Sequence, residues 1–306
     1  MAAPLILTVF VAVCCIGCAR RSPREIDWRG FDGQRAFAHV ERIVSFGPRP
    51  SGSTALGNVA NYISTRLREY GLDVEEQVFV APTPRGPLQF RNVIGKTRCK
   101  GQSHGGIIVI ASHYDTKYLP AIHFVGANDG GSSSGVLLEL ARLTPAIPDL
   151  WFVFFDGEEC INEYSPNDGL WGSTHFVNEL KNREKLNRIQ AMILLDMIGD
   201  RDLHVTIPAN SHPALVQRVF DSAKATGHRR YFSFTPIGII DDHVPFAMAG
   251  VPAVNLIDFQ FGSAPGLNDY WHTEQDTLDK ISPRSLEIVG QTVLHLLCSL
   301  RREPKL

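Results

Sequence analysis

Two adjacent carboxylates, Glu158 and Glu159, directly follow a run of apolar residues at 150–155. Such a run predicts a buried strand, and burying two acids at its end costs free energy unless they bind a cation or handle protons. Asp129, in Gly-Ala-Asn-Asp-Gly-Gly, and His272, in Tyr-Trp-His-Thr, also lie next to apolar segments. A catalytic zinc ion takes three oxygen or nitrogen ligands of these kinds and keeps one position open. We therefore predict that Asp129, Glu159 and His272 hold a divalent metal, with Glu158 beside it as a proton carrier.

Each residue also has a structural interpretation when it is taken singly. Asp129 precedes a predicted helix, where an Asp is a common N-cap. Asp196 follows three apolar residues and would serve equally well as the end of a strand, and Trp271 would fit a hydrophobic core. The Glu pair is harder to explain structurally, because strands rarely bury two neighbouring acids without a use for them.

The elements that must position these residues follow from the apolar pattern. A continuous run of β-branched residues at 107–111 is typical of a strand buried on both faces. Strands alternating with helices predict one α/β domain, with a mostly parallel, mixed central sheet flanked by helices. The predicted strands are 74–81, 90–96, 107–111, 150–155, 192–195 and 251–257. Helices are predicted to begin at Asp32 and Ser53 and to cover 132–143, 170–181, 213–225 and 282–299.

The acids and imidazoles follow the ends of these predicted strands. Ligands of open α/β sheets gather beyond the carboxyl ends of the strands, so these side chains are predicted to meet at one edge. The residues concerned are His113 and Asp115 after the first central strand, Glu158 and Glu159 after the second, Asp196 after the third, and Asp241-Asp242-His243 and His272 after later segments.

The 306-residue chain is 44% hydrophobic, which predicts a sizeable core, and its formal charge of −2 shows no basic excess for nucleic acid. Residues 4–17 are nearly all apolar but are too few to span a bilayer comfortably. We predict an export signal at 1–18, with or without a lipid on Cys18, whose context resembles a bacterial lipobox. A linker at 19–30 and a catalytic domain at 31–306 would follow. The expected location is periplasmic, extracellular or lipid-anchored to the cell envelope, with an uncleaved hydrophobic tail as the alternative.

Cysteine usage adds no further site. Three of the six cysteines belong to the amino-terminal segment, and the mature region keeps Cys99, Cys160 and Cys298. This odd, widely spaced set predicts neither a disulfide framework nor a cysteine-based metal site.

Six blocks, in order along the chain, resemble those of the zinc-dependent, animal-type glutaminyl-peptide cyclotransferases, which also occur in some bacteria. The likeness runs from about Val40 to Leu297 and implies the fold of the two-zinc aminopeptidases. The blocks are His113-Tyr114-Asp115-Thr116-Lys117, Gly126-Ala127-Asn128-Asp129, Phe154-Phe155-Asp156-Gly157-Glu158-Glu159, Leu194-Leu195-Asp196-Met197-Ile198-Gly199, Asp241-Asp242-His243-Val244-Pro245-Phe246 and Trp271-His272-Thr273.

The resemblance implies a role for each matching residue. One zinc per chain would be held by Asp129, Glu159 and His272, with Glu158 as the acid/base. The implied reaction is attack of the α-amine of an N-terminal Gln on its own side-chain amide, which releases ammonia and leaves pyroglutamate. The implied partners are peptides or proteins with N-terminal Gln, with N-terminal Glu as a further possibility. Asp196 and Asp241 would form an acidic network behind Glu158, and Trp271, Lys117 and Tyr164 would bind substrate.

The chain also departs from the animal enzymes. Ser112 and Ser134 stand where those enzymes carry a disulfide beside the site, so that bridge is absent. Tyr164 replaces a Trp, and the segment 258–269 is longer. We therefore expect a different pocket rim and a closer likeness to bacterial members.

Two other functions compete with cyclisation. A two-zinc aminopeptidase would find its five ligand types in His113, Asp129, Glu159, Asp196 and His272, so the ligand inventory does not separate the two enzymes. The Asp241-Asp242-His243 block and Trp271 favour the cyclase. A metal-poor binding module without turnover is the third reading, and the complete set of acids and the imidazole argues against it.

Overall fold

The computed structural model describes residues 27–98 and 106–303. The predicted export signal, most of the predicted linker and Cys99 lie outside these residues. Within the described part of the chain, no helix is long and apolar enough to cross a membrane.

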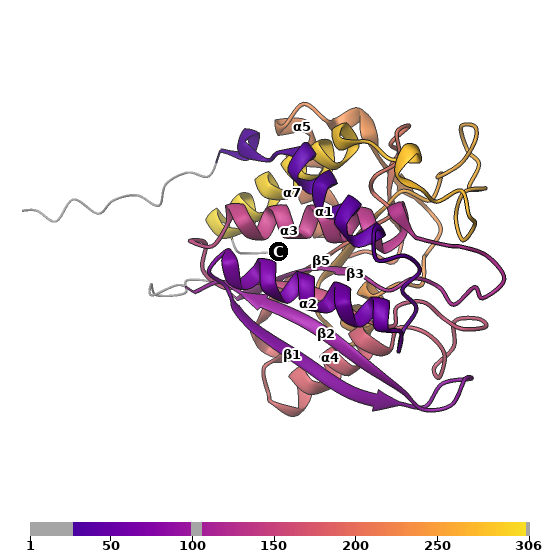
Figure 1. The fold of residues 1–306 in the computed structure, drawn as a ribbon. Helices are drawn as coiled ribbons and strands as arrows, with labels where there is room; N and C mark the ends of the chain where they lie inside the picture. The colour runs from indigo at the N-terminus through magenta and orange to yellow at the C-terminus, as the bar shows by residue number, and fades with distance from the viewer. Residues whose placement is uncertain (1–26, 99–105, 304–306) are drawn as a thin grey trace, which may run out of the picture.

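The described residues form one eight-stranded sheet and seven α-helices (Figure 1). The strands are β1 (Asp73–Ala81), β2 (Leu88–Lys96), β3 (Ile107–His113), β4 (Leu150–Phe155), β5 (Ile189–Asp196), β6 (Val205–Pro208), β7 (Phe232–Thr235) and β8 (Ala253–Ile257). The helices are α1 (Gly33–Val44), α2 (Thr54–Glu69), α3 (Ser133–Leu143), α4 (Trp171–Asn182), α5 (Pro213–Ala225), α6 (His243–Met248) and α7 (Pro283–Arg302).

The sheet is mixed, with the order β1-β2-β4-β3-β5-β8-β6-β7. The pairs β3–β4, β3–β5, β5–β8 and β6–β7 are parallel, whereas β1–β2, β2–β4 and β6–β8 are antiparallel. This architecture confirms the predicted single α/β domain with a mostly parallel sheet. The prediction missed β6, β7 and α6, which are short elements between the later predicted segments.

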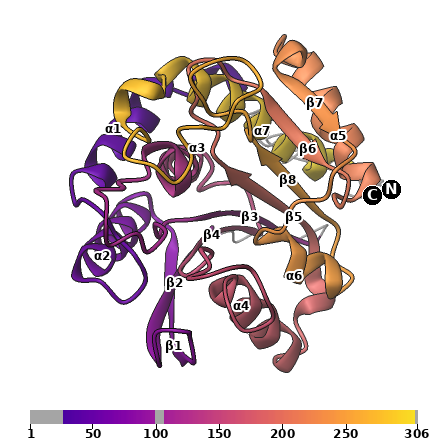
Figure 2. The ribbon, with the colours of Figure 1, turned by 90° about the vertical axis from the view of Figure 1, so that its right-hand side faces the viewer.

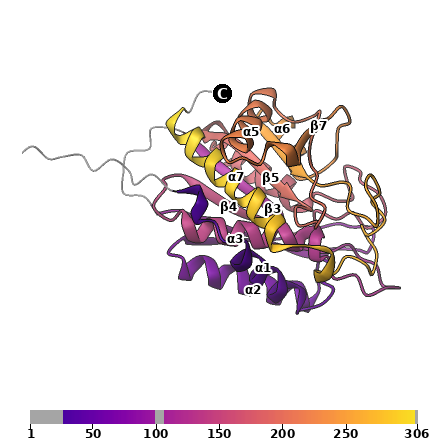
Figure 3. The same cartoon turned by 90° about the horizontal axis from the view of Figure 1, so that it is seen from above.

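Helices cover both faces of the sheet. Figure 2 shows α1, α2 and α3 on one side and α4 and α6 on the other, and Figure 3 shows α7 between α5 and α3. The side chains of Ile108 and Ile110 belong to the core beneath α1, α3 and α7, whereas Val109 and Ala111 pack with α4 and α6. Because successive strand residues point to opposite faces, both sets must be apolar, which explains the unbroken apolar run in β3.

Polar side chains fix the starts of the predicted helices. The Asp32 carboxylate accepts hydrogen bonds from the backbone N–H groups of Gln34 and Arg35 at the start of α1. The Ser53 hydroxyl does the same for Leu56 N in α2. These caps satisfy backbone donors that have no partner within the helix, so the chain turns into each helix at the residue that the sequence predicts.

Candidate active site

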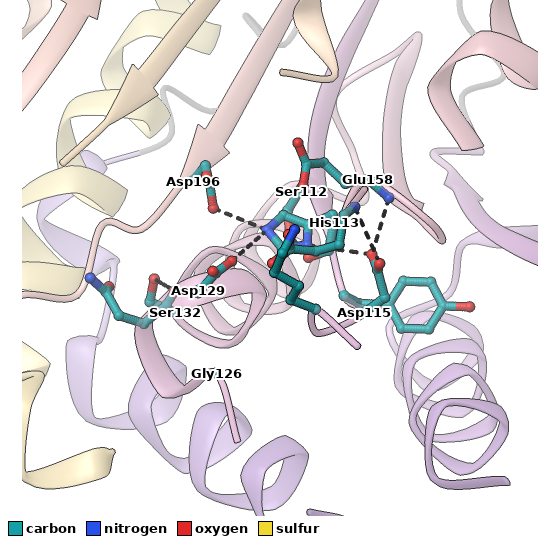
Figure 4. Close-up of polar contacts among 12 residues, drawn as sticks. Ser112, His113, Asp115, Gly126, Asp129, Ser132, Glu158 and Asp196 are labelled. Atoms are coloured by element: carbon teal, nitrogen blue, oxygen red, sulfur yellow. Dashed lines mark hydrogen bonds and ion pairs between the residues drawn. The ribbon is translucent and has the colours of Figure 1, made fainter. Parts of the chain in front are cut away.

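The carboxyl ends of β3, β4 and β5 meet at one edge of the sheet because these strands run parallel. His113 is the last residue of β3 and Asp196 the last of β5, and Glu158 and Glu159 follow β4. Figure 4 shows Asp129 and Asp196 both reaching towards the ring of His113. The predicted gathering of acids and imidazoles at this edge is therefore present in the fold.

Asp129, Glu159 and His272 converge although 143 positions (272 − 129) separate the first from the last. His272 Nε2 lies 3.0 Å from Glu159 Oε1 and 3.3 Å from Asp129 Oδ2. One ligand atom from each of the three residues lies within 4.8 Å of the others. Oxygen and nitrogen donors at this separation can close around a single cation.

His113 joins a second group with Asp129 and Asp196. Its Nε2 atom lies 3.1 Å from both Asp129 Oδ1 and Asp196 Oδ1. These three ligand atoms also lie within 4.8 Å of one another, so Asp129 is shared between two possible metal groups. Burial lowers the proton affinity of the ring, but the acids around it raise the pKa of His113 well above its ordinary value.

A distorted turn before α3 positions Asp129. The segment Ala127–Ser132 has a π-helical hydrogen-bond pattern that is broken by extended angles at Asp129 and by a positive φ of 70° at Gly130. A Cβ on Gly130 would lie 2.9 Å from Asp115 O and from His113 Cε1, so only glycine fits. The turn therefore brings the carboxylate of Asp129 against the end of β3.

Asp276 and Arg49 hold this turn from outside. The Asp276 carboxylate accepts hydrogen bonds from the backbone N–H groups of Asn128 and Asp129, at 2.6 and 3.0 Å. The fully buried guanidinium of Arg49 donates to Gly126 O at 2.9 Å and to Asp129 O at 3.3 Å, and also to Val125 O. Sequence reasoning missed Arg49 altogether, since no local pattern marks an arginine that bonds to distant backbone carbonyls.

The Glu pair is oriented through its backbone. The Asp115 carboxylate accepts from Glu158 N at 3.3 Å, as Figure 4 shows, and it also accepts from Glu159 N at 3.4 Å. The Glu158 side chain accepts the Tyr164 hydroxyl at 2.9 Å through Oε1 and at 3.0 Å through Oε2. Burial, followed by the nearby charge of Asp241, raises the pKa of Glu158 well above its ordinary value. Glu158 thus retains a proton more readily than an exposed glutamate does.

Asp241 lies in the loop before α6 and is itself held by hydrogen bonds. Its Oδ2 atom accepts from Asn255 Nδ2 at 2.7 Å, and its Oδ1 atom accepts from Asp242 N at 2.6 Å. Burial and the charge of Asp196 raise the pKa of Asp241 well above its ordinary value. The acids of this site therefore share protons instead of all being ionised together.

Aromatic rings fix the orientation of His272. Its backbone has a positive φ of 57°, which is unusual for a residue other than glycine. The Trp271 ring stacks on the imidazole at 3.9 Å between centroids, and the Phe124 ring meets it edge-on at 5.6 Å. Burial alone lowers its proton affinity, but Glu159 and Asp129 raise the pKa of His272 to about 9.

A cavity of about 560 Å³ opens over this cluster. Asp129, Glu159 and His272 lie on its wall with the rest of the acidic group, and a second wall is apolar. Among the predicted site residues, the cavity is lined by Asp129, Glu158, Glu159, Tyr164, Asp196, Asp241, Trp271 and His272. The apolar wall consists of Ile237, Ile239, Ile240, Ile257 and Phe259.

Lys117 is the one predicted substrate-binding residue outside the lining of this cavity. Its Nζ atom donates to Cys160 O at 2.7 Å and lies 3.1 Å from Cys160 Sγ and 3.7 Å from Glu159 Oε2. The structure thus places Lys117 behind Glu159, where its charge acts on a carboxylate and not on a ligand in the cavity. Ser112 and Ser134, the expected counterparts of a disulfide, have their hydroxyl oxygens 3.0 Å apart.

The acceptors of the cluster fit a bound cation. Among the described residues, the buried atoms Asp129 Oδ2 and Glu159 Oε2 accept no hydrogen bond, and their ion-pair contacts are His272 Nε2 at 3.3 Å and Lys117 Nζ at 3.7 Å. Burying charged acceptors without a hydrogen bond is costly, and a metal ion would offset that cost. Two carboxylates and one imidazole are also the ligand types that Zn²⁺ takes in catalytic sites.

Comparison with known proteins agrees with this geometry. Residues 92–297 match the family described as Peptidase family M28. The Glutaminyl-peptide cyclotransferase of Drosophila melanogaster is 30% identical over 263 residues, which cover 76% of this chain and 72% of the relative.

Solved structures give the same result. The crystal structure of Acidobacteriales bacterium glutaminyl cyclase is 37% identical and has a TM-score of 0.83, covering 94% of this chain and 98% of that chain. A Zn-dependent exopeptidase from Parabacteroides distasonis is also similar, at 27% identity and a TM-score of 0.74, covering 86% of this chain and 97% of that one. The chain thus resembles both cyclases and exopeptidases built on one fold.

Proposed function

The chain belongs to peptidase family M28, and we propose that it is a glutaminyl-peptide cyclotransferase acting on peptides or proteins with an N-terminal Gln. The observation that carries the proposal is the position of Glu158, a buried acid with raised proton affinity in the same cavity as Asp129, Glu159 and His272. That arrangement places a proton carrier beside a group that fits one cation. The similarity of this chain to glutaminyl cyclases along almost its whole length supports the same assignment.

We propose that Asp129, Glu159 and His272 hold one Zn²⁺ ion. When bound there, zinc supplies Lewis acidity towards the γ-carbonyl oxygen of the substrate glutamine. Lys117, at 3.7 Å from Glu159 Oε2, and Trp271, stacked on His272, keep two of these ligands in place. Such supporting contacts fix the ligand geometry before substrate arrives.

Glu158 is the proposed acid/base. The carboxylate accepts a proton from the α-amino group of the N-terminal Gln as that nitrogen attacks the side-chain carbonyl carbon. A C–N bond forms, the bond to the amide nitrogen breaks, and Glu158 returns the proton to the departing ammonia. Burial of Glu158, followed by the charge of Asp241, which Asn255 holds in place, keeps the pKa of Glu158 above its ordinary value and so favours its return of the proton as an acid.

The cavity walls position the substrate. Trp271 and the apolar residues facing it exclude water and hold the glutamine side chain folded towards its own amine. Holding two reacting groups of one molecule together replaces a conformational search by a positioned encounter. No water nucleophile takes part, so the same acids can serve cyclisation where a peptidase would activate water.

A zinc-dependent aminopeptidase is the second possible function. The observation that favours it is the second ligand group of His113, Asp129 and Asp196, which would accommodate a second metal ion. In that case Glu158 would deprotonate water instead of an amine.

Incubation of purified protein with a Gln-initiated peptide separates the two functions. Cyclisation releases ammonia and leaves a peptide about 17 Da lighter, by the loss of NH₃, whereas an aminopeptidase releases a free amino acid. The metal content is a second measure, with about one zinc per chain expected for the cyclase and two for the peptidase. A Gln-initiated peptide that loses its first residue would contradict our proposal.

A further inference from the structure

The loop between β4 and α4 returns to the residue from which it starts. Leu170 N donates to Glu158 O at 3.0 Å, and Trp171 N donates to Gly157 O at 2.9 Å. These two hydrogen bonds close the base of the loop directly beneath the Glu158 side chain. The residues in the middle of the loop are therefore held close to Glu158.

Inside the loop, a second set of contacts fixes its shape. The buried carboxylate of Asp168 accepts from Ile161 N at 2.6 Å and from Asn162 N at 2.9 Å. Ser165 and Asp168 are also joined by two backbone hydrogen bonds of 3.0 and 3.2 Å. A carboxylate that satisfies two backbone donors rigidifies the turn around it. The loop is therefore built to keep one conformation.

The ring at the centre of this loop is that of Tyr164. Gly169, with a φ of 93°, lies beneath it, and a Cβ at that position would approach Tyr164 Cδ1 to 2.6 Å. Gly169 thus makes room for an aromatic ring that rests on the loop and reaches into the cavity. At the end of that ring, the hydroxyl group lies 2.9 and 3.0 Å from the two oxygens of Glu158.

We infer that Tyr164 is a positioning residue for the acid/base, and that its hydroxyl holds the Glu158 carboxylate facing the substrate. A wall residue that only touches substrate would need no hydroxyl and no contact with both carboxylate oxygens. A hydrogen bond from a neutral phenol to a carboxylate is stronger than one between neutral groups, and it restricts rotation of the acid. This role deepens the proposed function and rests on it.

The phenol is suited to act as a donor. Burial, followed by the charges of Glu158 and Glu159, holds the pKa of Tyr164 well above its ordinary value. The hydroxyl therefore keeps its proton throughout the pH range in which the enzyme would work, and it can donate whenever Glu158 is ionised.

The test is a double-mutant cycle of Tyr164→Phe with Glu158→Gln. Tyr164→Phe keeps the ring over Gly169 and removes only the hydroxyl group. We expect kcat on a Gln-initiated peptide to fall about 10- to 100-fold, because a misplaced acid transfers protons poorly, with KM changed by less than about twofold. In the Glu158→Gln background the same substitution should change kcat by less than about twofold, since no acid remains to be positioned.

The control is Tyr70→Phe, which removes a part-buried hydroxyl that bonds to His39, and neither of these residues lines the cavity. Its kinetics should equal those of the unmodified protein, and all variants should retain their zinc. Equal losses of kcat from Tyr164→Phe in both backgrounds, or a rise in KM alone, would overturn the inference. Absence of any turnover in the unmodified protein contradicts the proposed function itself, whereas an active protein that tolerates Tyr164→Phe contradicts only the role of Tyr164.

Discussion

Residues of the same type have different tasks in this site because their surroundings differ. Glu158 and Glu159 are neighbours, yet Glu159 Oε1 lies 3.0 Å from an imidazole nitrogen whereas Glu158 accepts a phenol. Burial and the charge of Asp129 raise the pKa of Glu159, and the imidazole opposes that rise, whereas burial and the charge of Asp241 hold the pKa of Glu158 well above its ordinary value. One strand end thus supplies both a ligand and a proton carrier.

Glu158→Gln tests this division of tasks. Glutamine preserves the shape of the side chain but cannot carry a proton, so we expect kcat to fall by about 10²- to 10⁴-fold, with zinc content unchanged. Ammonia release gives kcat, and elemental analysis gives the zinc content. Glu163→Gln, in the same loop but exposed, is the matched control and should retain full activity. Loss of zinc from Glu158→Gln would mean that Glu158, and not only Glu159, binds the metal.

The sequence predicted the acids and imidazoles that lie next to apolar segments and missed Arg49. Glu158 and Glu159 could be singled out because polar residues that follow a buried strand are conspicuous, and Asp129 because it lies in a Gly-rich turn before a helix. Arg49 could not, since its bonds run to carbonyl groups 76 to 80 positions away in a turn that had not yet been placed. Lys117 was expected to bind substrate, but its ammonium group donates to Cys160 O and does not line the cavity.

At the scale of elements, length decided what could be predicted. The strands β3 and β4 could be predicted from their unbroken apolar runs. The helices α1 and α2 could be predicted from the polar residues that cap their starts. The strands β6 and β7 have four residues each, and β6 ends at Pro208, so neither shows enough alternation to be recognised. The register of β6 against β8, and of β7 against β6, is set by tertiary packing, which a local pattern does not contain.

A half-buried histidine joins α1 to α2. His39 Nδ1 lies 2.6 Å from the Tyr62 hydroxyl and His39 Nε2 lies 3.0 Å from the Tyr70 hydroxyl. Burial, followed by the charge of Arg66, lowers the pKa of His39 from 6.5 to about 4. The folded state therefore binds fewer protons than the unfolded chain between these two pH values. The contribution of neutral His39 to the free energy of unfolding is therefore fully present above pH 6.5 and is lost as the pH falls towards 4.

We predict that His39→Gln lowers the free energy of unfolding at pH 7.5 and loses most of this effect at pH 4.5. The part that depends on pH should be about 2 kcal/mol. Urea unfolding of both proteins at the two pH values measures it, and groups that titrate in both proteins cancel in the difference. The exposed His123 provides the control substitution, His123→Gln. The same pH dependence in the unmodified protein and in His39→Gln would show that the ring does not titrate in this range.

The whole molecule concentrates negative charge at one edge of the sheet although its formal charge is only −2. Five carboxyl groups line one cavity, those of Asp129, Glu158, Glu159, Asp196 and Asp241. Like charges held this close repel one another, so the folded state is under electrostatic stress wherever the acids are ionised. A cation bound among them relieves that stress only in the folded chain, because the unfolded chain does not bring the ligands together.

Removal of metal should therefore lower the stability of the entire domain. If free zinc stands about 100-fold above its Kd, binding stabilises the folded state by about 2.7 kcal/mol, which corresponds to about 5–10 °C in Tm for a domain of this size. We expect EDTA treatment followed by dialysis to lower Tm by this amount and zinc to restore it. Asp129→Ala should bind no zinc and should have a Tm that EDTA does not change. An unmodified protein that loses its zinc and keeps its Tm would show that the ligands are held apart by the scaffold alone, with Asp276 and Arg49 sufficient to maintain the turn.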